Sequence, residues 1–247
     1  MAVRGDEGVM DHRILVFTVH KAASLGVHEV LSRIAKKEKW PLYSPNLKTP
    51  NLVEPKEPGD AAFFEQLDGK TGLVGPIRMP VSLKDKAPDD KLVLHLRDPR
   101  DVLVSMFYSW SYSHPGVNED YRAGLIERGL DDFVRRESAR LKEKYALYVR
   151  DYLSLPGAVL LKYEDFVLDR PVWLKALLSA CGVDPERRFY EKLAKDNPAA
   201  KLRKEDKFSH IRKAAPGDHE EKLESETIAM LNRDWKEILQ ALGYGAA

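Results

Sequence analysis

Two short segments of the sequence combine basic side chains with hydroxyl donors in a pattern that suits an anionic ligand. In the first, His20 and Lys21 follow an apolar run, two alanines come next, and Ser24 opens a segment with helical spacing. The free N–H groups and positive dipole end of a helix start favour an anion, and the lysine adds a point charge. A helix start with a solvated lysine is the alternative. The expected contacts are Lys21, Ala22, Ala23, Ser24 and Leu25.

The second segment places an arginine at the end of an apolar run, with a serine eight residues later. Asp98 and Pro99 are typical of a helix start, so Ser105 lies about two turns into the helix that follows Arg97. The guanidinium fork of Arg97 can bind a phosphate through two hydrogen bonds, and Ser105 can donate another. In the alternative interpretation, Arg97 forms a structural salt bridge with Asp98 or Asp101.

The elements around these segments alternate between strands and helices. Short apolar runs predict strands, and spacings of three and four predict helices. Such alternation predicts an α/β fold in three layers, with a parallel sheet of about four to five strands flanked by helices. Ligands of such folds bind at the carboxyl ends of the strands, where both segments fall. The expected strands are residues 14–19, 73–78, 91–96 and 158–163, and the main expected helices are 24–35, 98–112, 131–155, 170–180 and about 220–242.

Composition narrows the class of protein. The 247 residues fit one domain, 1–247, with residues 1–12 expected to be a flexible N-terminus. The 40 basic and 39 acidic side chains argue against a general nucleic-acid binder. One cysteine, Cys181, allows no internal disulfide and no cysteine-rich metal site, and no metal-ligand spacing is visible. A polar N-terminus and the lack of a spanning apolar run predict a cytoplasmic protein without a transmembrane segment; the oligomeric state has no signal.

Together the two segments resemble the sulfotransferase family. The family's P-K-[ST]-G-[ST]-[ST] loop for the 5′-phosphosulfate stands here as H-K-A-A-S-L, residues 20–25. Its R-[ND]-P-x-[DE] junction, with a serine eight residues after the arginine, stands as R-D-P-R-D with Ser105. Two further matches follow in the family's order: LLKYEDFVLDR at residues 160–170 and HIRKAAPGDHEEKL at residues 210–223. The resemblance therefore extends over residues 16–223.

The resemblance implies a P-loop-like fold and a reaction. Members move a sulfuryl group from 3′-phosphoadenosine 5′-phosphosulfate to an acceptor, and they need no metal. By this likeness, Lys21 stabilises the departing phosphate and Ser24 with the loop amides holds the 5′-phosphate. The resemblance places Tyr163 near the adenine. It assigns the 3′-phosphate to Arg97, Ser105, Arg212 and Lys213.

The sequence departs from the family where a general base is expected. Cytosolic members carry histidine in an H-[LFV]-P-x-S-L segment, and the matching segment here is R-M-P-V-S-L, beginning at Arg78. Arginine stays protonated in proteins, so Arg78 is expected to bind an anionic acceptor or the moving sulfuryl group. His20 is the favoured base, because its ordinary pKa lies near neutrality, and Glu65 is an alternative. The acceptor class stays open between phenol, alcohol, lipid and sugar.

Two other functions remain compatible with the residues alone. A P-loop kinase-like phosphotransferase could use the same strand, loop and helix, although it would need a glycine-rich loop and a hydroxyl residue after the lysine. Ala22 stands at that position. A non-catalytic module that binds a nucleotide or a sulfated partner is the second, because Arg78 replaces histidine and Ala23 replaces glycine.

Overall fold

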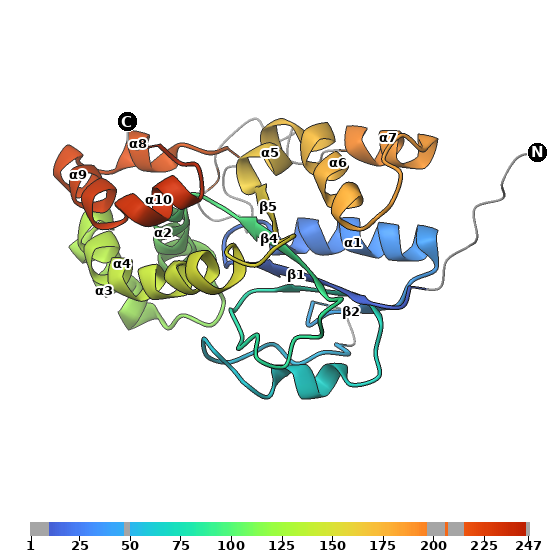
Figure 1. The fold of residues 1–247 in the computed structure, drawn as a ribbon. Coiled ribbons are helices and arrows are strands. Elements are labelled where there is room, and N and C mark those ends of the chain that lie inside the picture. The colour runs from blue at the N-terminus through green and yellow to red at the C-terminus, as the bar shows by residue number, and fades with distance from the viewer. Residues whose placement is uncertain (1–9, 47–49, 197–205, 207–214, 246–247) are drawn as a thin grey trace, which may run out of the picture.

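Five parallel strands form one sheet at the centre of the protein. The computed structural model describes residues 10–46, 50–196, 206 and 215–245 of the chain. The strand order is β2-β3-β1-β4-β5, and every neighbouring pair is parallel (Figure 1). The sheet therefore agrees with the predicted architecture. The strands are β1 (Arg13–Thr18), β2 (Leu42–Tyr43), β3 (Gly72–Ile77), β4 (Lys91–Leu96) and β5 (Val159–Lys162).

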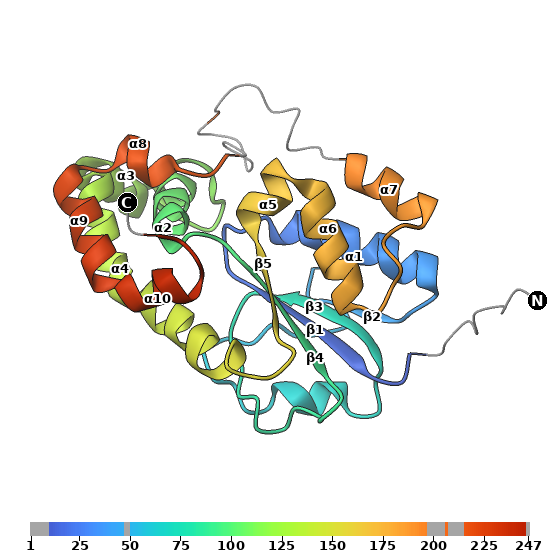
Figure 2. The same ribbon diagram turned by 45° about the horizontal axis from the view of Figure 1, so that its top comes forward.

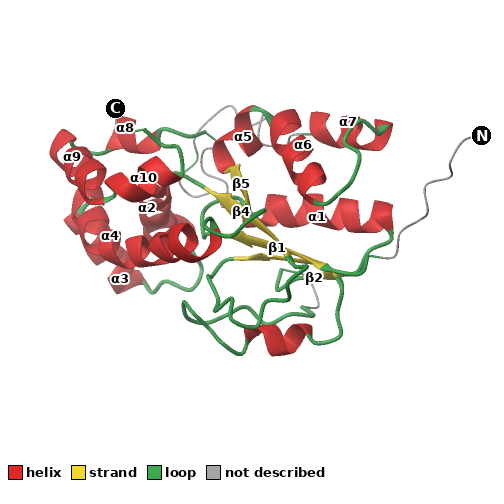
Figure 3. Cartoon of the chain, in the orientation of Figure 1, coloured by secondary structure: helices red, strands yellow, loops and turns green. Residues whose placement is uncertain are grey.

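The two faces of the sheet pack against different helices. Ile14 and Val16 belong to one buried cluster with α1 (Ser24–Glu38) and α6 (Arg170–Ala180). Leu15 and Phe17 belong to a second cluster with α2 (Pro99–Tyr108) and α4 (Leu130–Leu147). Side chains alternate along a strand, so β1 contributes to both layers and must be apolar throughout. Figure 3 shows the sheet between these helical layers.

The remaining elements are short, and several extend a longer helix. The π-helical turns η2 (Ser109–Ser113) and η3 (Tyr148–Tyr152) continue α2 and α4. Figure 2 shows the C-terminal helices against α4, and α7 beside α6. The other short elements are the 3-10 helix η1 (Phe63–Leu67) and the helices α3 (Glu119–Arg128), α5 (Tyr163–Leu168), α7 (Arg188–Lys195), α8 (Asp218–Lys222), α9 (Ser225–Asp234) and α10 (Lys236–Ala241).

The differences from the predicted elements have physical causes. β4 and α6 occupy the predicted residues, whereas the helix predicted for residues 220–242 is divided into α8, α9 and α10. The division between α9 and α10 falls at Trp235, which is buried and donates a hydrogen bond from Nε1 to Ser138 Oγ at 2.9 Å. This tertiary contact outweighs the helical periodicity of the local sequence.

A buried ion pair joins the starts of β1 and β4. Arg13 donates from Nε to Asp90 Oδ1 and from Nη2 to Asp90 Oδ2, each at 2.7 Å. Arg13 also donates from Nη1 to the Leu67 carbonyl at 3.1 Å. The fork geometry satisfies both charges at the edge of the sheet opposite the strands' carboxyl ends.

Removing the acid of this pair leaves a buried, uncompensated cation. We expect Asp90→Leu to lower the free energy of unfolding by about 3 kcal/mol. The double variant Arg13→Met/Asp90→Leu should recover much of that loss, because it removes both charges. Urea unfolding measures both variants. A double variant as unstable as the single one would contradict a penalty that arises from the unpaired arginine.

Candidate anion-binding site

The loop between β1 and α1 has an unusual backbone. Lys21 and Ala23 take positive φ angles of 68° and 57°. Each left-handed residue other than glycine costs about 1–2 kcal/mol, so surrounding contacts must impose this shape. Helix α1 begins at Ser24, as predicted, and its N-cap Ala23 provides no side-chain hydrogen bond. The first amides of α1 therefore lack a side-chain cap, which suits an anion.

The buried His95 of β4 makes a hydrogen bond to the loop between β1 and α1. Trp173 donates from Nε1 to His95 Nδ1 at 3.0 Å, so the His95 proton is on Nε2, which lies 2.9 Å from the Ala22 carbonyl oxygen. His95 is 0% exposed, and this burial lowers its pKa to about 3. The ring is thus neutral and donates to Ala22. His95 was not among the predicted site residues, because no local signal distinguishes it from a core histidine.

Arg97 connects the two predicted segments. It donates from Nη1 to the Lys21 carbonyl at 2.9 Å, and its guanidinium lies 4.3 Å from the centroid of the Tyr163 ring. Its Nη2 lies 3.6 Å from Asp101 Oδ2. Nε and Nη2 are buried and make no hydrogen bond to the residues that the structure describes. The alternative salt bridge with Asp101 is therefore present, but it leaves two donors of Arg97 unused.

Asp98 has a different role from the one that the alternative interpretation gave it. It caps α2 by accepting from the Arg100 amide at 2.9 Å, and its Oδ2 lies 2.6 Å from Arg100 Nη2. The expected N-cap is thus confirmed. Asp98 pairs with Arg100, and the acid nearest to the Arg97 guanidinium is Asp101. Ser105 is part-buried on α2 one turn beyond Asp101, on the same helix face.

Asp101 fixes the segment that follows the late basic motif. It accepts from the Gly217 amide at 2.7 Å and from the His219 amide at 3.0 Å, and His219 Nδ1 lies 2.7 Å away. Burial would raise the pKa of Asp101, but the hydrogen bonds from His219 and the charge of Arg97 outweigh it and lower the pKa to about 2. The start of α8 is therefore held beside Arg97. Two predicted contacts, Arg212 and Lys213, lie outside the described residues.

Two tyrosines of α4 and η3 anchor the opposite side of the site. Tyr145 donates to the Arg97 carbonyl at 2.7 Å, and Tyr148 donates to the Thr18 carbonyl at 2.8 Å. Both residues are 0% exposed, and burial raises the pKa of both phenols well above the usual value. They therefore remain protonated donors. α4 is held against the carboxyl ends of β1 and β4 by these bonds.

Arg78 and His20 lie at the neighbouring strand ends. Arg78 follows β3, where Ile77 pairs with Phe17, and it donates from Nε to Glu54 Oε2 at 2.8 Å. Its Nη2 and backbone amide also contact the Glu54 carboxylate. The His20 residue is exposed on one side. Loss of water around the rest of the ring, followed by the charges of Arg78, Lys144 and Lys21, lowers its pKa to about 4.

The structure thus brings most of the predicted residues to one edge of the sheet. Lys21, Arg97 and Tyr163 form connected contacts, and His20 and Arg78 lie beside them. Ala22 and Ala23 follow in the same loop, and Ser24 and Leu25 are the first residues of α1. Glu65, the alternative base, is an exposed residue of η1. Glu54, Lys144, Tyr145 and Tyr148 were missed, because their relation to the site exists only in the folded chain.

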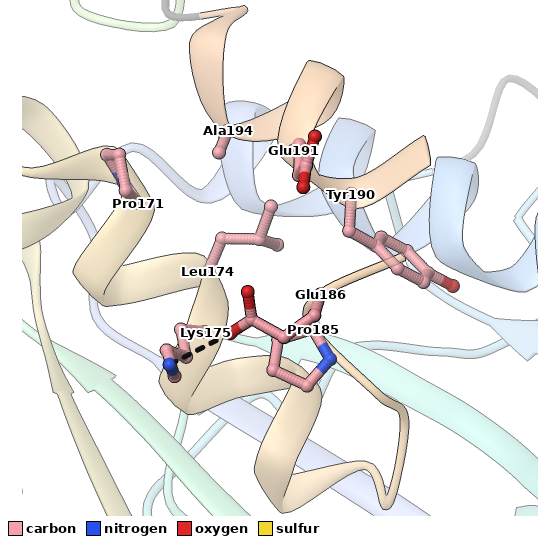
Figure 4. A pocket seen from close by; sticks show the side chains of 8 residues that line it. All are labelled: Pro171, Leu174, Lys175, Pro185, Glu186, Tyr190, Glu191 and Ala194. Atoms are coloured by element: carbon pink, nitrogen blue, oxygen red, sulfur yellow. Dashed lines mark hydrogen bonds and ion pairs between the residues drawn. The ribbon is translucent and has the colours of Figure 1, made fainter. Parts of the chain in front are cut away.

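A shallow pocket elsewhere has different chemistry. It encloses about 150 Å³ between α6 and α7 (Figure 4). Leu174, Tyr190 and Ala194 contribute to its lining, and Lys175 Nζ pairs with Glu186 Oε1 at 3.0 Å. None of the predicted site residues lines this pocket. It is therefore separate from the anion-binding residues.

The part of the chain that the structure describes contains neither a cluster of metal ligands nor a helix that could cross a membrane. No group of three or more His, Cys, Asp or Glu side chains in those ranges could hold a metal ion. Among the helices in the same ranges, none combines the length and the apolar character that crossing a bilayer requires.

Comparisons with known proteins place the chain in a family. Residues 77–243 match the family model of the sulfotransferase domain. Mouse sulfotransferase SULT7A1 complexed with PAP is similar in structure, with a TM-score of 0.54 and 18% identity over 95% of this chain and 84% of that chain. Retinol dehydratase in a complex with retinol and PAP is also similar, with a TM-score of 0.53 and 16% identity over 95% of this chain and 83% of that chain. These likenesses establish the fold. No curated protein sequence matches the chain.

The neutral His95 makes the stability of the fold depend on pH. Its folded-state pKa of about 3 lies below the ordinary 6.5, so between these values the unfolded chain binds a proton that the folded chain does not. Stability should fall as the pH falls, by about 1.4 kcal/mol per pH unit from this residue. We expect His95→Gln to remove that contribution in urea unfolding between about pH 6 and about pH 5. The exposed His114→Gln is the control. An unchanged pH slope in His95→Gln would contradict the assignment.

Proposed function

The chain belongs to the sulfotransferase family, and on that premise we propose that it transfers a sulfuryl group from 3′-phosphoadenosine 5′-phosphosulfate to the hydroxyl of an acceptor. The observation that carries this proposal is the position of Arg97. One buried guanidinium contacts the Lys21 loop, lies over the Tyr163 ring and retains two donors without hydrogen bonds to described residues. Family membership also decides against a kinase-like phosphotransferase.

The residues fit a nucleotide with phosphates at both ends. Lys21, Ser24 and the amides of the β1–α1 loop would hold the 5′-phosphosulfate, because the uncapped helix start favours an anion. Arg97 and Ser105 would hold the 3′-phosphate, and Tyr163 would lie near the adenine. Arg212 and Lys213 complete the proposed contacts. The similar structures of mouse SULT7A1 and retinol dehydratase, both complexed with PAP, support this assignment.

Lys21 has the central role in the proposed reaction. The bound donor supplies the sulfuryl group; its sulfur–oxygen bond to phosphate breaks as a bond to the acceptor oxygen forms. Lys21 would stabilise the negative charge that grows on the bridging oxygen of the departing phosphate. A cation at this position stabilises the transition state more than the ground state. No step of this scheme requires a metal.

The proton of the acceptor hydroxyl needs a destination. His20 lies next to Lys21, and its pKa of about 4 keeps the ring neutral near pH 7. A neutral ring can accept a hydrogen bond from the hydroxyl and orient it, although a conjugate acid of this strength holds a proton weakly. We therefore assign His20 to orient the hydroxyl and pass its proton to solvent. Arg78, held by Glu54, would face the acceptor or the moving sulfuryl group.

The proposal treats residues 1–247 as one domain. β1 and α1 precede the matched residues 77–243, yet β1 lies between β3 and β4 in the sheet and carries the Lys21 loop. A sulfotransferase site therefore needs both parts. A cytoplasmic location remains part of the proposal, and the buried free thiol of Cys181 is compatible with a reducing compartment.

Removing the Lys21 charge should abolish turnover without unfolding the protein. The donor becomes 3′-phosphoadenosine 5′-phosphate (PAP) when it loses its sulfuryl group. We expect Lys21→Ala to lower the rate of PAP formation, measured with a panel of hydroxyl acceptors, by about 100-fold or more. Its far-UV circular dichroism should match the wild type. Lys36→Ala, an exposed position on α1, is the matched control. Turnover close to the wild-type rate in Lys21→Ala would contradict the role of Lys21.

Removing the Arg97 side chain should weaken binding of the 3′-phosphate specifically. We expect Arg97→Ala to reduce PAP affinity by about 1.5–3 kcal/mol, the scale of a hydrogen bond to a charged group, measured by calorimetry. Affinity for adenosine 5′-phosphosulfate, which lacks the 3′-phosphate, should fall by a smaller amount, because that ligand loses only the support that Arg97 gives to the Lys21 loop. An equal loss for both ligands would mean that Arg97 acts through the loop, and it would reject the 3′-phosphate assignment.

A further inference from the structure

One part-buried lysine lies beside the buried residues of α4. Leu141 and Tyr145 are buried on this helix, and Tyr148 is buried at the first residue of η3. Lys144 lies three residues after Leu141 and four before Tyr148, so it shares their face of the helix. A charge in such a part-buried position costs free energy unless it is paired. A part-buried cation therefore lies on the same helix face as these buried side chains.

Lys144 has no counter-ion in the described part of the chain. No hydrogen bond or ion pair of its ammonium group occurs among the residues that the structure describes. Burial, followed by the charge of Arg140, lowers the pKa of Lys144. Both influences disfavour the charged form, and a bound anion would reverse them. The surroundings of Lys144 are thus those of a cation that lacks its partner.

The two tyrosine hydrogen bonds direct this part of α4 toward the reaction site. Tyr145 binds the carbonyl at the end of β4, and Tyr148 binds the carbonyl at the end of β1. Lys144 lies between these anchors, close enough for its charge to affect His20. Arg78 reaches the same residue from β3. Cationic side chains from α4 and β3 therefore flank His20.

The charges around His20 do not balance among the described residues. Glu54 neutralises Arg78 through its bidentate contact. Lys144 has no equivalent acid among the described residues, and the charged or titratable neighbours with the largest effect on the pKa of His20 are basic: Arg78, Lys144, Lys21 and His114. A neutral acceptor would not supply the anionic partner for Lys144 that the described side chains lack.

We propose that the acceptor carries an anionic oxygen group, such as a carboxylate, sulfate or phosphate, beside the hydroxyl that is sulfated, and that Lys144 binds this group. The inference rests on the proposed function, because His20 marks the acceptor side of the site. A charge-assisted hydrogen bond from a half-buried lysine would select such acceptors over neutral ones. Lys144 is then a residue that determines acceptor specificity.

The experiment compares acceptors that differ only in the anionic group. The probes are hydroxyphenylpropionate and methyl glucuronide, each compared with its own methyl ester, which cover a phenol and a sugar. For the wild type, we expect kcat/KM to be about 10- to 100-fold higher for the anionic member of at least one pair. Lys144→Met should remove this preference and Lys144→Arg should retain most of it. Lys142→Met, at an exposed position on α4, is the matched control.

PAP binding, measured by calorimetry, separates the possible failures. Unchanged PAP affinity in Lys144→Met, together with the lost preference, supports the inference. Equal turnover of both members of each pair by the wild type would overturn it while leaving sulfuryl transfer intact. Weaker PAP binding in Lys144→Met would overturn it by assigning Lys144 to the donor. If the wild type bound no PAP, the proposed function would fail and the inference with it.

Discussion

The site depends on two hydrogen bonds that β4 makes to the loop after β1. Arg97 donates to the Lys21 carbonyl and His95 donates to the Ala22 carbonyl. These bonds fix a backbone in which Lys21 and Ala23 are left-handed, at a cost of about 1–2 kcal/mol each. Buried hydrogen bonds of this kind can offset that cost, since leaving the carbonyls unsatisfied would cost about 1–3 kcal/mol per group. The anion-binding loop is therefore shaped before any ligand arrives.

The same interaction makes the two ends of the nucleotide site one unit. Arg97 belongs to the proposed 3′-phosphate site, yet it also holds the loop proposed for the 5′-phosphosulfate. Tyr145 fixes the Arg97 backbone, and Asp101 links its side chain to the start of α8. A displacement of Arg97 would thus reach the loop, α4 and the C-terminal segment together. This coupling explains why a single buried cation has contacts from four separate elements.

Local sequence patterns predicted the strands and helices better than they predicted the tertiary contacts between side chains at the site. The bounds of β4 and α6 followed from apolar periodicity and from turn residues, and the anion-binding segments followed from Lys21, Arg97 and the helix start at Ser24. The tertiary contacts were not readable in this way. Lys144 belongs to a helix with many charged residues, so its sequence position resembles a solvated face. Only the hydrogen bonds of Tyr145 and Tyr148 to the ends of β4 and β1 show that its part of the helix lies at the site.

The substitution of arginine at position 78 changes how the site can handle the acceptor proton. A histidine there would take the proton, whereas Arg78 cannot, and Arg78 and Lys144 instead contribute positive charge near His20, on the proposed acceptor side of the site. Positive charges favour the oxyanion form of a hydroxyl, just as they disfavour the protonated form of His20. The site would then lower the pKa of the acceptor hydroxyl by electrostatics instead of removing its proton with a strong base. Such a mechanism works best for a hydroxyl that is already acidic, and it suits an acceptor whose anionic group is neutralised by Lys144 and so does not oppose ionisation.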